Sequence, residues 1–427
     1  MKKINISIIG LGYVGLPLAI EFGKYYNVVG YDVNPYRIKQ LQKNNDINGE
    51  VSKKEFISSK KLIFTNNKSD IEDCNIYIVT VPTPINKKNI PDLSLIKNAC
   101  NLIAKFIKKN NFIIFESTVY PGLTKEFSIP LIEKLTRLSI NKDFYCGYSP
   151  ERVNPGDKKR KLKNIKKIVS GSNSYSLNFI YKLYTKIIKA GVHKVSSIEV
   201  AEAAKVIENC QRDINIAFVN ELSMIFDRMN INTDEVLKAA LTKWNFLNFQ
   251  PGLVGGHCIG VDPYYLTYQA KKFGYNSKII SSGRNVNNNM SNFIVNKLVN
   301  SMQKNDIHTD KSNLLIMGFT FKENCKDTRN TKILDVIKLS NKIFKNIDVY
   351  DPLANKEEVH TLYNIDLLKN PKKNQYHAII ILVNHKIFKD HGLNKIIAFG
   401  KSKSIIYDFK NIFKLKNNLS LKNDISY

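Results

Sequence analysis

The stretch INISIIGLGYVGLPLAIEFGKYYNVVGYDVN, residues 4–34, decides the fold of this chain. Its first seven residues form a β-branched apolar run, which is typical of a buried parallel strand. Three glycines in the spacing GxGxxG follow and open a helix, and Asp32 lies at the end of a second strand, 17 residues beyond Gly15. Strand, glycine turn, helix and strand together predict a parallel, doubly wound α/β sheet with ligands at the carboxyl ends of its strands.

The glycine turn also predicts a cofactor. Gly10, Gly12 and Gly15 permit a tight turn, close approach of a pyrophosphate and close helix packing, while the helix N-terminus attracts phosphate. Asp32 accepts hydrogen bonds from ribose hydroxyls and repels a 2′-phosphate, so we expect NAD rather than NADP. Arg37 could favour NADP, but an acidic residue at the strand tip usually dominates. A purely structural glycine turn is the alternative, and the strand–helix context disfavours it.

Charge and composition narrow the class of protein. The net charge is +28, but only eight of the 65 basic residues are arginine, and lysine together with asparagine and isoleucine is what an AT-rich genome favours. The nearest basic cluster, GDKKRKLKNIKK at residues 156–167, is expected to be a solvated loop, and no nucleic-acid-binding module is present. We therefore expect no nucleic-acid partner.

The chain has 427 residues, of which 43% are hydrophobic, enough for two or three domains. Its six cysteines are scattered without a CxxC pair, which suits a reducing compartment. The lysines and apolar run at the N-terminus are broken by glycines, unlike a signal peptide, and no apolar run is long enough to span a membrane. A soluble, cytoplasmic protein without a metal centre is expected.

Further strand-like runs divide the rest of the chain. We predict two Rossmann-like domains, residues 1–195 and 306–427, flanking a helical domain, residues 196–305, with a long helix near 196–230. The runs VVGYDVNP and IDVYDPLA are a faint internal echo between the outer domains. Thr233 is expected to cap a short helix, and the last ten or so residues to be frayed.

Several polar residues stand out as catalytic candidates. In PGLVGGHCIGVDPYYL, residues 251–266, Cys258 lies among glycines with Asp262 four residues on, although an inert packing cysteine is an equal alternative. His257 is expected to anchor this loop. On the long helix Lys205 and Asn209 share one face, and a polar pocket competes there with a solvated stripe. The nearby charged residues are Glu202, Glu208 and Arg212.

An ordered set of motifs resembles a known family. GLGYVGLP, VPTP…PDLS, ESTVYPG, YSPERVNPGD, AEAAKVIEN, GGHCIGVDPYYL, GFTFKENCKDTRNT and YDP follow one another along nearly the whole chain. Together they resemble the UDP-glucose/GDP-mannose dehydrogenase family. TKWNFLNFQPGLVGGHCIGVDPYYL resembles the branch that acts on UDP-N-acetylhexosamines for surface polysaccharides. UDP-glucose enzymes tend to carry an aromatic residue and a lysine where this chain has Leu253 and Val261.

The resemblance implies a homodimeric enzyme, or a larger assembly of it, that oxidises C6 of the sugar twice with two NAD⁺. Residues 196–305 would hold the dimer interface and residues 306–427 the UDP-sugar. The implied catalytic set is Cys258, Lys205, Asn209, Asp262, Glu151 and Thr118. The implied cofactor-binding set is Gly10, Gly12, Tyr13, Val14, Gly15, Asp32, Arg37, Pro82, Thr83, Ser117, Thr118 and Arg329. The implied substrate-binding set is Glu151, Arg152, Lys205, Asn209, Phe249, Pro251, Gly252, Gly255, Phe321 and Lys322.

Two positions depart from some relatives. Pro155 stands where UDP-glucose enzymes have a second glutamate, so hydrolysis is expected to depend on Glu151, and Lys410 stands where some relatives have a substrate-binding arginine. UDP-N-acetylglucosamine is the first expected substrate, with UDP-N-acetylgalactosamine or UDP-glucose as alternatives. A two-electron hydroxyacid dehydrogenase and a non-catalytic NAD- or nucleic-acid-binding protein are the competing functions. The number of NADH formed per sugar separates the two enzymes.

Overall fold

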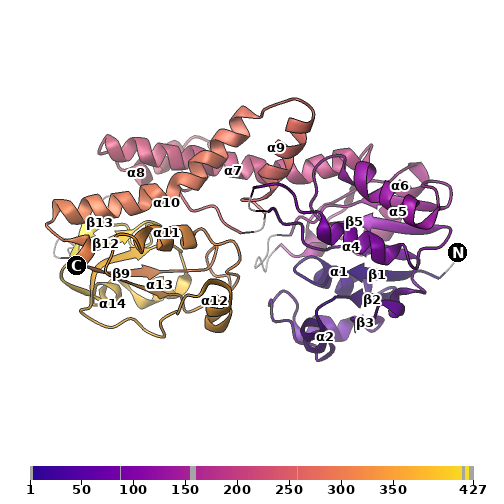
Figure 1. The fold of residues 1–427 in the computed structure, drawn as a ribbon, viewed down its shortest axis with the longest axis horizontal. Helices are drawn as coiled ribbons and strands as arrows, with labels where there is room; N and C mark the ends of the chain where they lie inside the picture. The colour runs from indigo at the N-terminus through magenta and orange to yellow at the C-terminus, as the bar shows by residue number, and fades with distance from the viewer. Residues whose placement is uncertain (1–2, 87, 154–159, 257, 416–418, 423–427) are drawn as a thin grey trace. The chain divides into compact units, whose positions relative to one another are not determined.

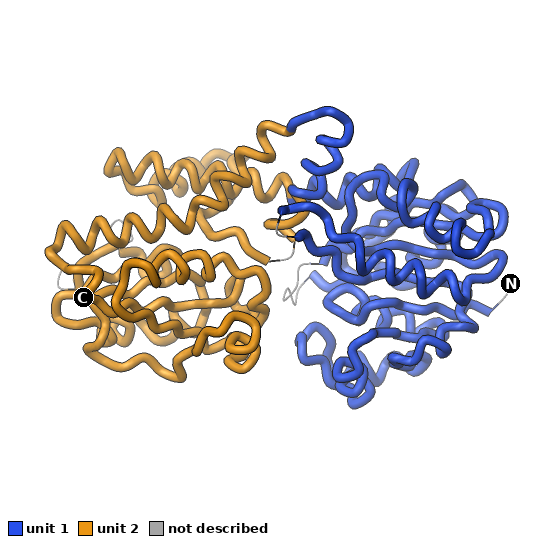
Figure 2. Tube along the Cα trace, viewed as in Figure 1, with its two compact units in different colours: residues 1–209, 264–276 blue, residues 210–263, 277–427 orange. Residues whose placement is uncertain are grey.

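A computed structural model describes residues 3–86, 88–153, 160–256, 258–415 and 419–422. The chain divides into two compact units (Figure 2). Unit 1 contains residues 1–209 and 264–276, and unit 2 contains residues 210–263 and 277–427. Within the described residues, no helix is both long and apolar enough to cross a bilayer.

Unit 1 contains the parallel sheet that residues 4–34 predict (Figure 1). Its strand order is β3-β2-β1-β4-β5-β6, and each neighbouring pair is parallel. The order reverses between β1 and β4, which is where an open α/β sheet binds ligands. The strands are β1 (Asn5–Ile9), β2 (Asn27–Tyr31), β3 (Leu62–Thr65), β4 (Ile76–Val79), β5 (Asn111–Phe115) and β6 (Phe144–Tyr148).

Helices cover this sheet because their apolar faces need burial. Helix α1 packs on β1 and β2, α4 on β4, and α6 on β6. A short parallel pair, β7 (Lys167–Val169) and β8 (Val192–Lys194), follows the sheet. The helices are α1 (Gly15–Phe22), α2 (Pro35–Gln42), α3 (Lys53–Ser58), α4 (Ser94–Ile103), α5 (Ile129–Thr136) and α6 (Ser174–Thr185), with single turns at Lys68–Ile71, Thr124–Ser128 and Leu162–Asn164.

Unit 2 contains a second sheet, in the order β10-β9-β11-β12-β13. The prediction of a frayed C-terminal end is wrong for residues 419–421, which pair antiparallel with β12. Leu419 and Leu421 pack against the apolar core, which explains why the edge strand forms. Residues 423–427 lie outside the described residues. The strands are β9 (Asn313–Met317), β10 (Asn346–Tyr350), β11 (Tyr376–Ile381), β12 (Gly400–Asp408) and β13 (Leu419–Leu421).

The predicted long helix is α7 (Ile198–Arg228), which passes from unit 1 into unit 2. Helix α8 (Thr233–Ala240) is capped by Asn232, not by Thr233 as predicted, because the Asn232 side chain accepts the amides of Asp234 and Glu235. The remaining helices are α9 (Asp262–Lys272), α10 (Lys278–Lys304), α11 (Ile333–Ser340), α12 (Lys356–Tyr363), α13 (Lys386–His391) and α14 (Leu393–Ile397), with one turn at Thr309–Lys311.

The internal echo has a structural basis. After β1, Gly10 has a φ of +97°, and the next amide, of Leu11, donates to Asp32 at the end of β2. After β9, Gly318 also has a φ of +97°, and the next amide donates to Asp351 at the end of β10. In each unit, therefore, the aspartate at the end of the second strand of the motif accepts a hydrogen bond from the amide that follows the glycine of the turn.

Candidate active site

The three glycines of the first turn meet different surroundings. A Cβ on Gly15 would lie 1.8 Å from the carbonyl oxygen of Gly10 and 2.4 Å from Oγ1 of Thr80, so only glycine lets α1 approach so closely. A Cβ on Gly12 would meet nothing within 4 Å. The turn is thus tightly packed at one glycine and open at another, as a bound pyrophosphate requires. These residues fit a dinucleotide.

Asp32 lies half-buried at the end of β2. Its Oδ2 accepts the Leu11 amide at 2.8 Å, and its Oδ1 accepts the Asn34 amide at 2.9 Å. Each carboxylate oxygen keeps lone-pair capacity for a ribose hydroxyl. Arg37 is buried instead: its Nε donates to the Leu11 carbonyl at 3.0 Å and its Nη1 pairs with Asp46 at 2.8 Å. Arg37 therefore supports the turn, and its contact with a cofactor stays a prediction.

The next strands bring further predicted residues to the same edge of the sheet. Ser117, after β5, donates from Oγ to the Val81 carbonyl at 2.7 Å and so ties the ends of β4 and β5 together. The Tyr265 hydroxyl donates to the Thr83 carbonyl at 3.0 Å. Around them Tyr13, Val14, Thr83 and Thr118 are half-buried and Pro82 is exposed.

Helix α7 presents a buried polar face. Glu202, Lys205 and Asn209 lie on it, at 0%, 9% and 7% exposure. The Glu202 carboxylate accepts the amides of Gly122 at 2.6 Å and Thr124 at 3.0 Å, which ties α7 to the loop that follows Thr118. Burial raises the pKa of Glu202 to about 7. The polar-pocket alternative thus fits these three residues, whereas Arg212 is exposed.

Glu151 is held in the loop after β6. Its Oε1 accepts the amides of Arg152 at 2.6 Å and Val153 at 2.5 Å, while its Oε2 lies 3.4 Å from Nζ of Lys167. Arg152 donates to the Lys166 carbonyl at 2.9 Å and pairs with Glu208 of α7 at 2.7 Å. The two predicted residues of this loop are therefore both anchored. Pro155 lies outside the described residues.

The prediction of a solvated loop at residues 156–167 is wrong for Lys167, the first residue of β7. It is 2% exposed, and its Nζ lies 2.6 Å from Oε2 of Glu116. Burial alone would lower the pKa of Lys167, but Glu116 and Glu151 outweigh it and raise the pKa above its usual value. The physical reason is that strand β7 turns this ammonium toward buried carboxylates. Residues 154–159 lie outside the described residues.

In unit 2, Cys258 and Asp262 form one turn. The amide of Asp262 donates to the Cys258 carbonyl at 2.8 Å, where α9 begins. Cys258 is exposed, and Asp262 is 3% exposed. The four-residue spacing thus places an accessible thiol one helical turn from a buried carboxylate. His257 lies outside the described residues.

The glycines beside Cys258 pack against the loop at residues 321–330. A Cβ on Gly256 would meet the Phe321 ring at 2.8 Å, and one on Gly255 would lie 2.7 Å from the Asn330 carbonyl oxygen. The structure therefore brings Gly255 and Phe321, two predicted substrate residues, to one place. The Arg329 side chain donates two hydrogen bonds to Asp327, at 2.9 and 2.7 Å, and its backbone amide donates a third at 3.0 Å.

The backbone of Gly252 forms hydrogen bonds with a residue that we did not predict. The side chain of Asn220, on α7, donates to the Gly252 carbonyl at 3.0 Å and accepts its amide at 2.8 Å. Nζ of Lys410 donates to the neighbouring Pro251 carbonyl at 3.0 Å, and burial lowers the pKa of Lys410. In unit 2, Lys410 thus holds the backbone of the predicted substrate loop. Phe249 and Lys322 are half-buried.

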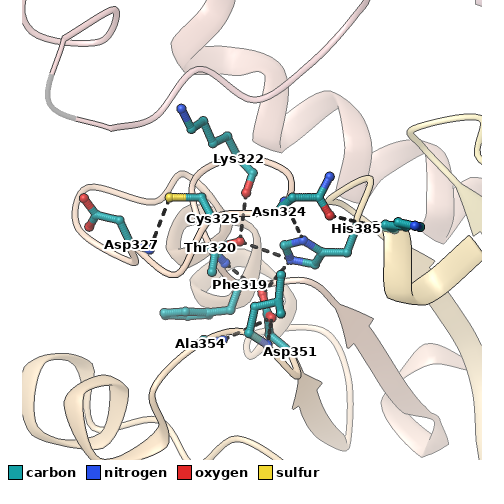
Figure 3. Close-up of polar contacts among 11 residues, drawn as sticks. Phe319, Thr320, Lys322, Asn324, Cys325, Asp327, Asp351, Ala354 and His385 are labelled. Carbon is teal, nitrogen blue, oxygen red and sulfur yellow. Dashed lines mark hydrogen bonds and ion pairs between the residues drawn. The ribbon is translucent and has the colours of Figure 1, made fainter. Parts of the chain in front are cut away.

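The counterpart of Asp32 in unit 2 is closed off (Figure 3). Asp351 is 1% exposed and lies 3.1 Å from Nε2 of His385. Nδ1 of His385 accepts the Asn324 amide at 3.0 Å, which leaves Nε2 to face Asp351 and Oγ1 of Thr320, each at 3.1 Å. Burial would raise the pKa of Asp351, but His385 and two backbone amides outweigh it and lower the pKa. Asp351 is therefore enclosed by protein groups that bind its carboxylate, whereas Asp32 is half-buried.

The residues that we missed share one property, which is burial of a polar side chain. They are Glu116, Lys167, Tyr184, Asn220, Asp351 and His385. A polar residue inside a predicted apolar helix face was a signal for Asn220. For Asp351, the internal echo between VVGYDVNP and IDVYDPLA was a signal, because it aligns Asp351 with Asp32. For Glu116, Lys167, Tyr184 and His385, the partners are distant in sequence and no local pattern marks them.

Comparisons with known proteins show the family of this chain. Residues 4–188, 199–289 and 315–415 match the NAD binding, central and UDP binding domains of the UDP-glucose/GDP-mannose dehydrogenase family. The UDP-N-acetyl-D-glucosamine 6-dehydrogenases of Salmonella typhi and Pseudomonas aeruginosa are each 50% identical over 96% of this chain and cover 96% and 97% of their own lengths. A solved UDP-D-ManNAc dehydrogenase from Pyrococcus horikoshii has a TM-score of 0.84 at 31% identity, covering 92% of each chain.

These matches confirm the predicted fold class, enzyme class and cofactor. The matched segments contain strands of both sheets and the helices that lie between the two sheets along the sequence. The chain belongs to the UDP-glucose/GDP-mannose dehydrogenase family, and it is an NAD-dependent nucleotide-sugar dehydrogenase.

Proposed function

We propose that this protein oxidises C6 of UDP-N-acetylglucosamine twice, from alcohol to uronic acid, for surface polysaccharide synthesis. The exposed Cys258 one helical turn from buried Asp262 carries the proposal, because a two-electron dehydrogenase needs no such nucleophile. The names of the two relatives at 50% identity support the choice of sugar. UDP-N-acetylgalactosamine and UDP-glucose are the second candidates.

In the first oxidation, Lys205 and Asp262 would hold a water that takes the proton of the C6 hydroxyl. NAD⁺, held by residues 1–195, would supply the hydride acceptor for the two oxidations. The buried positions of Lys205 and Asp262 favour this role, because groups shielded from bulk water act more strongly on developing charge. Asn209, one helical turn from Lys205, would donate to the same oxygen.

In the second oxidation, the Cys258 thiolate would add to the aldehyde carbon and form a thiohemiacetal. Lys205 and Asn209 would stabilise its oxyanion. Loss of the second hydride leaves a thioester on Cys258. Glu151, with Thr118, would take a proton from water as the resulting hydroxide attacks the thioester, and the Cys258 thiolate leaves.

Three parts of the chain would have separate functions in this reaction. Residues 1–195 would hold NAD, residues 196–305 would supply the catalytic loop and the dimer interface, and residues 306–427 would hold the UDP-sugar. The closure of Asp351 by His385 supports placing NAD on the first part, because a ribose needs an accessible aspartate. We propose a cytoplasmic location, because NAD and nucleotide sugars are cytoplasmic metabolites.

The function is tested by NADH yield on a panel of UDP-sugars. We expect two NADH per sugar and the highest kcat/KM with UDP-N-acetylglucosamine. The product should carry a C6 carboxylate by mass spectrometry. One NADH per sugar with an aldehyde product would reject the four-electron mechanism, and a higher kcat/KM for another sugar would reject the proposed substrate.

Asp32 should set the choice between NAD⁺ and NADP⁺. Replacing Asp32 by Asn removes the charge that repels a 2′-phosphate but keeps the shape of the side chain. We expect the NAD⁺/NADP⁺ ratio of kcat/KM to fall about 10- to 100-fold, the size of one or two hydrogen bonds to a charged group. Asp70→Ala, on an exposed turn, is the control. Equal use of both cofactors by the wild type would contradict this role.

The exposed face of α7 should form a homodimer interface. Val200, Ile207, Phe218 and Ile225 are 45%, 52%, 51% and 42% exposed and lie on one side of the helix, opposite its buried polar face. Such an apolar stripe is typical of an interface, and a two-fold axis would pair it with itself.

We expect a particle of twice the 48.9 kDa chain mass, and expect Phe218→Glu to dissociate it, because each dimer would bury the added charge twice. Light scattering measures the mass. Ile57→Glu is the matched control, since Ile57 of α3 is also an exposed apolar residue. A fully active monomeric wild type would contradict the proposal.

A further inference from the structure

A buried ion cluster lies behind Glu151. Lys167 and Glu116 are 2% and 1% exposed, and the hydroxyl of Tyr184, on α6, donates to Glu116. The three residues come from β7, the end of β5 and α6, so the fold assembles them from distant segments. Removing an ammonium and carboxylates from water is costly unless each is paired. The proposed chemistry assigns none of the three a task.

We propose that Lys167 positions the Glu151 carboxylate for thioester hydrolysis, and that Glu116 is the companion charge that allows Glu151 to take up a proton. This inference rests on the proposed function, in which Glu151 is the base. Lys167 and Glu116 are positioning residues, because they act through Glu151.

The contacts fix the orientation of the Glu151 carboxylate. Two loop amides bind its Oε1, at 2.6 and 2.5 Å, and the Lys167 ammonium faces its Oε2 at 3.4 Å. Both lone pairs of Oε1 are thus engaged by amides, whereas Oε2 retains a second lone pair that can still accept a proton from water. A general base must hold such a geometry, because proton transfer requires hydrogen-bond distance.

The two unequal distances around Lys167 explain the need for Glu116. Nζ lies 2.6 Å from Glu116 but 3.4 Å from Glu151, so its shorter ion pair is with the residue that does not react. In hydrolysis, Glu151 takes a proton from water, oxygen bonds to the thioester carbon, and the C–S bond breaks with its electrons on sulfur. Glu151 is then neutral.

At that stage, if Glu116 were absent, the Lys167 ammonium would be buried without a counter-charge, which is strongly destabilising. Two carboxylates around one ammonium avoid this, because either one is enough to neutralise it. The Tyr184 ring lies under the same ammonium, 5.6 Å from Nζ, and adds a favourable cation–π contact. The cluster can therefore gain and lose one proton while Lys167 stays paired.

The experiment separates oxidation from hydrolysis in single turnovers. NADH absorbance follows the two oxidations, and intact-protein mass follows the sugar bound to Cys258. Lys167→Met combined with Glu116→Gln removes the ammonium and its companion charge together. Hydrolysis should fall about 100-fold, within the range of general-base catalysis, while both oxidations and NAD⁺ binding stay within about threefold.

Two further variants guard against misfolding of the double variant. Glu116→Gln alone keeps Lys167 beside Glu151 and should slow hydrolysis about 10-fold, because proton uptake would then isolate the ammonium. Lys167→Arg alone leaves Glu116 intact and keeps the positive charge. It should therefore retain most of the hydrolysis that the double variant loses. Thermal melting of each variant is recorded alongside.

Wild-type hydrolysis in the Lys167→Met/Glu116→Gln or the Glu116→Gln variant would overturn the proposal. Equal loss of oxidation, hydrolysis and melting temperature would also overturn it, since that pattern indicates a structural cluster only. Failure of the proposed function looks different. The wild type itself would then release one NADH per sugar and form no thioester, whatever stands at position 167.

Discussion

Replacing Cys258 by serine should abolish the second oxidation. Serine is a much poorer nucleophile than a thiolate and, if acylated, a poorer leaving group, so overall turnover should fall by several orders of magnitude, on the order of 10⁴-fold. Binding of NAD⁺ and UDP-sugar should persist, because the side chains have nearly the same size. Stopped-flow NADH formation and ligand titrations measure the two effects separately.

The matched control is Cys74→Ser, because Cys74 is buried and burial raises its pKa to about 12. That variant should lose stability rather than chemistry. Cys258 is exposed and the other five cysteines are buried, so iodoacetamide should modify the wild type once and inactivate it. Turnover of Cys258→Ser at the wild-type rate would defeat the covalent mechanism.

Replacing Glu151 by glutamine should stop the reaction at the thioester. The amide keeps the size of the side chain and an oxygen for the two loop amides, but it cannot take a proton from water. Hydrolysis should slow about 10²- to 10⁴-fold, the usual contribution of a general base. Intact-protein mass spectrometry should then show the protein with one uronyl UDP-sugar attached.

The adduct should be absent when Cys258→Ser is combined with Glu151→Gln, which locates it on sulfur. Glu133→Gln is the control, because Glu133 is a carboxylate of α5 that accepts the Ile140 amide at 2.9 Å and lies outside the proposed site. Rapid hydrolysis by Glu151→Gln would assign the base to another residue. An adduct that survives without Cys258 would refute the thioester.

Local patterns were sufficient where the deciding interactions are local. The glycine spacing predicted the turn after β1, and the apolar runs within residues 4–34 predicted β1 and β2. The α8 cap was misassigned because Asn232 and Thr233 are both good capping residues, and backbone geometry chose between neighbours. The final strand was missed because residues 419–421 are too short a run to show a period.

The catalytic candidates likewise include residues that local spacing predicts and residues whose partners are distant in the sequence. Cys258 and Asp262 were predictable as a pair, because four residues make one helical turn and α9 begins at Asp262. Lys167 was misjudged because its sequence neighbours are basic and polar, whereas its partners are far away along the chain. Glu116 is 51 residues from Lys167, and Tyr184 is 68 residues from Glu116.

The sequence by itself determined the parallel sheet, the NAD-binding turn and the family, since each depends on residue types at short, regular spacings. Only the tertiary structure decided which polar side chains are buried together. It placed Asn220 on the backbone of Gly252, and it closed Asp351 with His385 while leaving Asp32 half-buried. The physical reason is that burial and pairing of charges depend on packing between distant segments, which sets the solvation of each group and which no local period encodes.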